Sequence, residues 1–84
     1  MSRHPVRVEV ISRRQCSACQ DLKRRLAEAG IEFADWDTAT VEGRAAAAWY
    51  DNPDVLPQVA FDGRLLADPE EVFRLAKGNP HARR

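Results

Sequence analysis

Two cysteines separated by two residues are the part of this sequence whose type and spacing best suit chemistry. Cys16 and Cys19 are the only cysteines among 84 residues, and they occur in the segment Arg-Arg-Gln-Cys-Ser-Ala-Cys. Residues three apart are neighbours on a helix, so the two sulfurs can form a disulfide with little change in the backbone. A CxxC pair between a predicted strand and a predicted helix indicates redox chemistry rather than packing.

The expected position of Cys16 at the start of a helix favours its thiolate, which is the form that attacks sulfur. The free N–H groups and the dipole of a helix N-terminus stabilise an anion, and Arg13 and Arg14 add positive charge nearby. Such surroundings lower the pKa of a cysteine below the ordinary value of about 8.5. We therefore expect Cys16 to attack and Cys19, further into the helix, to resolve the mixed disulfide.

Metal binding is the main alternative use of two cysteines. A closed zinc site usually needs four ligands, and His4 and His81 lie near opposite ends of the chain. We therefore expect no metal site within one chain. A metal ion or iron–sulfur cluster that bridges two chains through Cys16 stays open as a non-enzymatic function. A redox-inert interaction module is a third hypothesis, and it predicts an ordinary thiol pKa for Cys16.

The elements that must position the cysteines follow the order β-α-β-α-β-β-α. Period-two and helical spacings of apolar residues distinguish strands from helices. The predicted strands cover residues 6–11, 31–36, 58–61 and 64–67, and the predicted helices cover residues 16–29, 41–50 and 69–77. The apolar positions of the first helix are Ala18, Leu22, Leu26 and Ala29. The βαβ half requires parallel strands, and Asp62-Gly63 predicts an antiparallel hairpin, which gives an α/β fold with a four-stranded mixed sheet flanked by helices.

Local signals define the ends of the helices. Gly30 is expected to end the first helix in a left-handed conformation. Thr38 or Thr40 is expected to cap the second helix, in which Gly43 weakens the first turn. Asp68 is expected to cap the last helix, which Lys77-Gly78 closes. Two further expectations concern side chains: the aromatic residues Trp36, Trp49 and Tyr50 belong to the core, and the basic residues Lys23, Arg24 and Arg25 form a solvated face.

Length and charge exclude several classes of function. The chain is short enough for one domain over residues 1–84, and its 13 basic and 13 acidic residues balance. This balance argues against nucleic acid or a membrane surface as a partner. No apolar run approaches the roughly 20 residues of a membrane-spanning helix, and the first residues lack the pattern of a signal peptide. We therefore expect a cytoplasmic monomer.

The order of elements, the Cys-Ser-Ala-Cys motif and the segment Val-Leu-Pro-Gln-Val-Ala-Phe-Asp-Gly resemble the thioredoxin fold and, within it, the glutaredoxins. The resemblance covers residues 6–77. It implies that Cys16 and Cys19 are the redox-active pair and that a cis-proline, Pro57, faces them. The residues Val55 and Leu56, which precede this proline, would position a substrate peptide or glutathione. Arg13 matches the basic residue that often lies three positions before the first cysteine.

The same resemblance extends to the start of the last helix and to the activity. Ala67-Asp68 stands where many glutaredoxins have Gly-Gly, and Glu70 falls near their acidic position, so Asp68 and Glu70 are expected to take part in binding the substrate. The implied function is a thiol–disulfide oxidoreductase that reduces protein disulfides or glutathionylated proteins. It would need no bound cofactor. Glutathione is the candidate co-substrate, and either glutathione or thioredoxin reductase would supply electrons.

Overall fold

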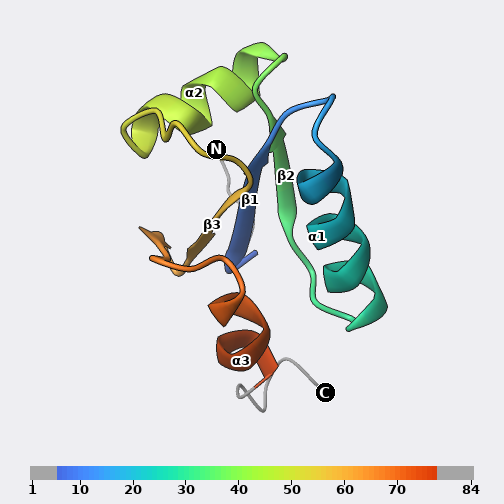
Figure 1. The fold of residues 1–84 in the computed structure, drawn as a ribbon. Helices are drawn as coiled ribbons and strands as arrows, with labels where there is room; N and C mark the ends of the chain where they lie inside the picture. Colours follow the sequence, from blue (N-terminus) through green and yellow to red (C-terminus); the bar gives the residue numbers. More distant parts are fainter. Residues whose placement is uncertain (1–5, 78–84) are drawn as a thin grey trace.

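Seven elements follow one another in the predicted order in the computed structural model, which describes residues 6–77 (Figure 1). The strands are β1 (Val8–Ser12), β2 (Ala34–Asp37), β3 (Gln58–Phe61) and β4 (Arg64–Leu65). The helices are α1 (Ser17–Glu28), α2 (Val41–Trp49) and α3 (Glu71–Lys77). Gly78, which the sequence predicts to close the last helix, lies outside the described residues, as do His4 and His81.

The four strands form one mixed sheet in the order β2-β1-β3-β4. Strand β1 runs parallel to β2 and antiparallel to β3, and β3 forms an antiparallel hairpin with β4. Asp62 and Gly63 connect this hairpin with φ angles of 53° and 85°, as a two-residue turn between twisted strands requires. The mixed sheet and the hairpin confirm the prediction. Strand β4 ends two residues earlier than predicted.

Helices cover both faces of the sheet. On one face, Leu22 and Leu26 of α1 and Val72 of α3 pack against the strands. The strand residues in this core are Val8, Val10 and Val59. Neighbouring strand residues point to opposite faces, so Glu9 lies on the other face, where the Tyr50 hydroxyl at the end of α2 donates to its carboxylate. The sheet therefore separates α1 and α3 from α2.

Helix α1 keeps its predicted place with two corrections. Cys16 is the N-cap rather than the first helical residue, because its backbone is extended, at φ −145° and ψ 101°. Ala18 and Ala29 are exposed, and Cys19 occupies the buried position expected for Ala18. Gly30 ends the helix at φ 75°, and the N–H of Ile31 donates to the carbonyl of Leu26 over 3.0 Å. This left-handed glycine confirms the predicted end of the helix.

Helix α2 begins at one of the two predicted caps. Thr40 has an extended backbone, and its hydroxyl accepts a hydrogen bond of 2.9 Å from the N–H of Gly43. The helix ends before Asp51, whose φ of 63° is left-handed. The N–H of Asn52 then donates to the carbonyl of Ala47 over 2.7 Å. The first and last turns of α2 are thus both closed by specific hydrogen bonds.

The three large aromatic residues near α2 are not the core that the sequence predicts. Trp49 is 80% exposed, whereas Trp36 and Tyr50 are half-buried. Trp36 Nε1 and the Tyr50 hydroxyl donate to the two carboxylate oxygens of Glu9, over 3.0 and 3.1 Å. Helix α2 instead buries the small residues Gly43 and Ala47, while Ala45 and Ala48 are exposed. The sequence could not show this, because four consecutive alanines leave the buried face of the helix undefined.

Tyr50 provides a pH-dependent test of this packing. Burial, the nearby negative charge of Glu9 and the hydrogen bond to Glu9 raise the pKa of Tyr50 to about 12. Because this folded value exceeds the unfolded value of about 10, the contribution of Tyr50 to stability is fully present below about pH 10 and is lost as the pH rises through about 12. Tyr50 is the only tyrosine, so tyrosinate absorbance after a rapid pH jump measures it directly. We expect Glu9→Gln to lower the pKa of Tyr50. A titration midpoint near the ordinary value of 10 for Tyr50 in the folded wild-type protein would contradict this packing.

No helix in the described range is both long enough and apolar enough to cross a membrane.

Candidate active site

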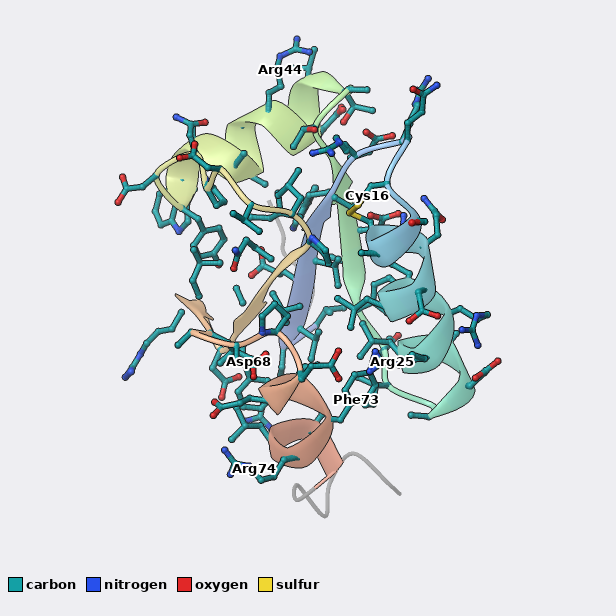
Figure 2. The ribbon with its side chains drawn as sticks, in the orientation of Figure 1. Cys16, Arg25, Arg44, Asp68, Phe73 and Arg74 are labelled. Atoms are coloured by element: carbon teal, nitrogen blue, oxygen red, sulfur yellow. A yellow bond between two sulfur atoms is a disulfide. The ribbon has the colours of Figure 1, made fainter. Side chains whose placement is uncertain are left out.

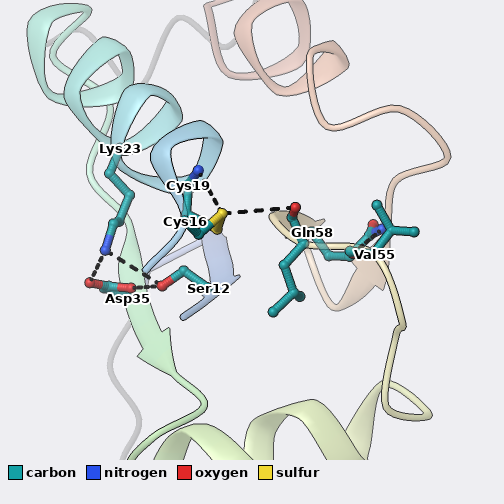
Figure 3. Close-up of a disulfide and its surroundings, with 8 residues drawn as sticks. Ser12, Cys16, Cys19, Lys23, Asp35, Val55 and Gln58 are labelled. Carbon is teal, nitrogen blue, oxygen red and sulfur yellow. Dashed lines mark hydrogen bonds and ion pairs between the residues drawn. A yellow bond between two sulfur atoms is a disulfide. The ribbon is translucent and has the colours of Figure 1, made fainter. Parts of the chain in front are cut away.

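Cys16 and Cys19 form a disulfide where β1 passes into α1 (Figures 2 and 3). Their Cα atoms are 5.2 Å apart, within the normal range for a disulfide. Cys16 is partly exposed and Cys19 is fully buried. The Sγ atom of Cys16 also accepts a hydrogen bond of 3.1 Å from the backbone N–H of Cys19. In the reduced protein, the same N–H at the helix start is placed to stabilise a Cys16 thiolate.

The loop before β3 approaches the exposed sulfur. The carbonyl oxygen of Leu56 lies 4.0 Å from Cys16 Sγ, and the Leu56–Pro57 peptide bond is cis, as the resemblance implies. Gln58 Nε2 donates to the carbonyl of Val55 over 2.9 Å and thereby holds this loop (Figure 3). The Val55 side chain is 69% exposed. The fold therefore brings three of the predicted residues, Leu56, Pro57 and Cys16, to one place.

The two arginines before Cys16 differ in their surroundings. Arg14 pairs with Asp37 at the end of β2 over 3.2 Å, so its charge is partly neutralised. Arg13 is exposed and makes no hydrogen bond or ion pair with another residue in the range 6–77. The role of Arg13 beside Cys16 remains a prediction.

A polar network lies beside the disulfide, and the sequence did not predict this network. The hydroxyl of Ser12, which is 1% exposed, donates to Asp35 Oδ1 over 2.9 Å. Lys23 Nζ donates to Asp35 Oδ2 over 2.9 Å and lies 3.5 Å from the Ser12 hydroxyl (Figure 3). Lys23 is four residues after Cys19, so both side chains share one face of α1. The spacing of Cys19 and Lys23 is the one feature of this network that the sequence contains. The position of Asp35 depends on the parallel register of β1 and β2, which the sequence does not specify.

The basic segment of α1 is only in part the solvated face that the sequence predicts, because Arg24 is exposed whereas Lys23 and Arg25 are partly buried. The Lys23 side chain is only 17% exposed in its pair with Asp35. Arg24 pairs with Asp21 and Glu28 on its own helix. Each of these cations already has a carboxylate partner, which leaves little unpaired charge for an acidic partner to recognise.

Asp68 and Glu70 lie together before α3, but both carboxylates are engaged within the chain. Asp68 Oδ1 accepts from the N–H of Glu70 over 3.0 Å, but α3 begins at Glu71, two residues later than predicted, so Asp68 stabilises the turn before the helix and is not its N-cap. Glu70 forms a two-bond ion pair with Arg25 of α1, whose guanidinium stacks 4.7 Å from the ring centre of Phe73 (Figure 2). Arg25 is nine residues after Cys16, or about 13 Å along the helix. The role of Asp68 and Glu70 in substrate binding remains a prediction.

The side chains that the structure describes around the cysteine pair bear on the metal alternative. Within residues 6–77, no group of three or more His, Cys, Asp or Glu side chains is placed to hold a metal ion. The two cysteine sulfurs are bonded to each other. The arrangement around Cys16 suits exchange between thiols and disulfides better than metal coordination.

The element order, the mixed sheet and the CxxC pair at the start of α1 define a thioredoxin-like fold. Glutaredoxin 1 from Francisella tularensis, in a crystal structure complexed with cacodylate, has a similar fold, with a TM-score of 0.59 and 20% sequence identity. The match covers 84% of this chain and 92% of that glutaredoxin. No protein-family model and no curated protein sequence matches the chain. The comparison supports the fold that the sequence predicted.

Proposed function

We propose that this protein is a glutaredoxin-like thiol–disulfide oxidoreductase that acts through Cys16 and Cys19. The observation that carries the proposal is a disulfide at the N-terminus of α1 with one partly exposed and one buried cysteine. An attacking sulfur must be accessible, and a resolving sulfur needs only to reach its neighbour. The glutaredoxin fold of the structural relative supports the same chemistry.

The reaction begins with the reduced pair. The Cys16 thiolate attacks one sulfur of a substrate disulfide, and the other substrate sulfur leaves as a thiolate that takes a proton from water. Cys19 then attacks Cys16 Sγ, and its proton passes to the departing second substrate thiol. The substrate gains two electrons and the cysteine pair loses two, which gives the Cys16–Cys19 disulfide seen in the structure.

The surrounding residues would have distinct parts in this cycle. The N–H of Cys19 stabilises the Cys16 thiolate, and Arg13 adds positive charge close in sequence. The backbone of Leu56, beside Cys16 Sγ, would hold the extended chain of a substrate, with Val55 and Pro57 shaping the approach. Asp68 and Glu70 would contribute at the start of α3. Disulfide-containing and glutathionylated proteins in the cytoplasm are the proposed substrates.

The source of electrons decides which kind of oxidoreductase this is. The oxidised protein should be assayed with glutathione plus glutathione reductase, and separately with thioredoxin reductase, while the consumption of NADPH is followed. We expect turnover in at least one assay. Turnover with glutathione would indicate a glutaredoxin, and turnover with thioredoxin reductase alone would indicate a thioredoxin-like redoxin.

Failure in both assays would contradict the proposed coupling. Brown protein with visible absorbance after anaerobic purification would then favour the cluster-binding alternative. Colourless protein that forms the internal disulfide reversibly would leave a dedicated electron donor as the explanation.

A further inference from the structure

A second candidate site lies on the sheet face that α2 covers, and it includes neither cysteine. A shallow, open cleft of about 530 Å³ lies between α2 and the sheet. Its polar and aromatic lining consists of Glu9, Trp36, Glu42, Trp49 and Tyr50. Both tryptophans of the chain and its only tyrosine therefore line one cleft. The proposed oxidoreductase chemistry uses none of these residues.

The carboxylate of Glu9 is held in this cleft by neutral groups. Its two oxygens accept hydrogen bonds from Trp36 Nε1 and from the Tyr50 hydroxyl, which are neutral donors. The raised pKa of Tyr50 keeps this hydroxyl protonated at neutral pH. Neither Glu9 nor Glu42 forms an ion pair with any residue between 6 and 77. The site thus combines a fixed, partly buried carboxylate with aromatic walls and no cation from the described chain.

The exposure of the Trp49 side chain indicates a role in binding rather than in stabilising the fold. An indole that is 80% exposed contributes little burial to the fold. Exposed tryptophans are enriched at binding hot spots, because their large rigid rings bury much area on contact. The ring faces of tryptophan also attract cations. Aromatic surface and negative charge in one cleft therefore favour a flat, cationic group.

The same combination of an aromatic ring and a carboxylate occurs twice elsewhere in the chain, each time around an arginine side chain. Arg25 stacks on Phe73 and pairs with Glu70. Arg7 stacks 4.9 Å from the ring centre of Phe61 and pairs with Asp62 through two hydrogen bonds of 2.7 Å. In both places a guanidinium meets an aromatic ring and a carboxylate at once. The cleft presents these two partners without the guanidinium.

We propose that the cleft beside α2 binds an arginine side chain of a partner protein. A guanidinium is planar and can stack on an indole while it donates two hydrogen bonds to a carboxylate. It is also less strongly hydrated than an ammonium group, so a half-open cleft favours arginine over lysine. The two carboxylates repel phosphate groups, which excludes nucleic acid as the occupant. The proposal is independent of the chemistry of the cysteine pair.

The test uses the blocked peptide Gly-Arg-Gly and two matched peptides with lysine or the uncharged arginine analogue citrulline. Intrinsic tryptophan fluorescence and the indole N–H resonance of Trp36 both report on the cleft. We expect saturable changes in both signals with the arginine peptide, with a dissociation constant in the millimolar range. The citrulline peptide should cause no change, and the lysine peptide should bind at least about threefold more weakly.

Variants assign the binding to the cleft. Trp49→Ala removes an exposed side chain and keeps Trp36 as the reporter, and Glu9→Gln removes the charge while retaining an amide oxygen. Each should weaken binding of the arginine peptide at least about fivefold. Glu32→Gln, at an exposed carboxylate outside the cleft, should have no effect. Equal binding of the citrulline or lysine peptide, or undiminished binding by both cleft variants, would overturn the proposal. Cys16→Ser should bind the peptide normally, which separates this result from any failure of the redox proposal.

Discussion

Replacing Cys16 with serine is expected to reduce disulfide reductase activity at least about a thousandfold, because a hydroxyl group does not replace a thiolate as the nucleophile toward sulfur. The measurement is NADPH-coupled reduction of a disulfide or glutathionylated substrate with whichever donor supports the wild-type protein. Retention of wild-type activity by Cys16→Ser would contradict the proposed mechanism, whichever electron donor is used.

The fold of this variant should be preserved. Cys16 is the N-cap of α1, and its sulfur accepts a hydrogen bond from the N–H of Cys19. Serine is among the preferred N-cap residues and can accept the same bond. Loss of activity would therefore reflect lost chemistry, and a far-ultraviolet circular dichroism spectrum like that of the wild type verifies this. Ser17→Ala, which changes an exposed residue between the cysteines, is the matched control and should retain activity.

Cys19→Ser distinguishes attack from resolution. This variant keeps the accessible Cys16 but lacks the sulfur that displaces the bound substrate. With glutathione disulfide, we expect a stable adduct of one glutathione per protein, detected by intact mass. The wild-type protein should instead reach the internal disulfide, and Cys16→Ser should form no comparable adduct at the buried Cys19. An adduct on Cys16→Ser alone would reverse the assigned roles.

The sequence predicted the fold because its signals are local. Alternating valines in residues 6–11, the helical spacing of Leu22 and Leu26 before Gly30, and the Asp62-Gly63 turn each specify one element. The CxxC spacing likewise located Cys16 at the start of α1, since both the chemistry and the helix boundary depend on neighbouring residues. Short-range patterns therefore sufficed for the element order and for the cysteine pair.

The features that the sequence did not reveal depend on contacts between distant residues. Asp35 joins Ser12 and Lys23 only through the register of β1 and β2. Arg25 and Glu70 form an ion pair although they are 45 residues apart in the sequence. Opposite charges are common throughout this sequence, so no local pattern identifies which of them pair. The reason for Gly43 near the start of α2 is likewise a contact between separate segments, which the sequence does not show.

Replacing Gly43 with alanine is expected to destabilise the protein by about 3 kcal/mol or more, although alanine favours helices over glycine by about 1 kcal/mol. Gly43 is buried in the first turn of α2. A Cβ atom there would overlap the carbonyl carbon and oxygen of Asp37 and would lie 2.9 Å from its amide nitrogen. The measurement is the midpoint of urea unfolding, followed by circular dichroism with the disulfide intact in both proteins.

The carbonyl of Asp37 cannot move aside without further loss. It accepts hydrogen bonds of 2.9 Å from the N–H of Thr40 and 2.7 Å from its hydroxyl. That hydroxyl in turn accepts from the N–H of Gly43, so the cap and the close approach form one structure. A methyl group at Gly43 must therefore displace the first turn of α2 or break the cap. Either change costs a large part of the roughly 5–15 kcal/mol that stabilises small domains.

Arg44→Ala, at the next and exposed position of α2, is the matched control. It places alanine at an exposed position of the same turn, so its unfolding midpoint should stay close to that of the wild type. If Gly43→Ala were as stable as Arg44→Ala, α2 would have to lie further from the end of β2 than it does here. Glycine has a lower helix propensity than alanine, so its presence at position 43 needs another explanation. The close approach of the Asp37 backbone supplies that explanation, and equal stability of the two variants would remove it.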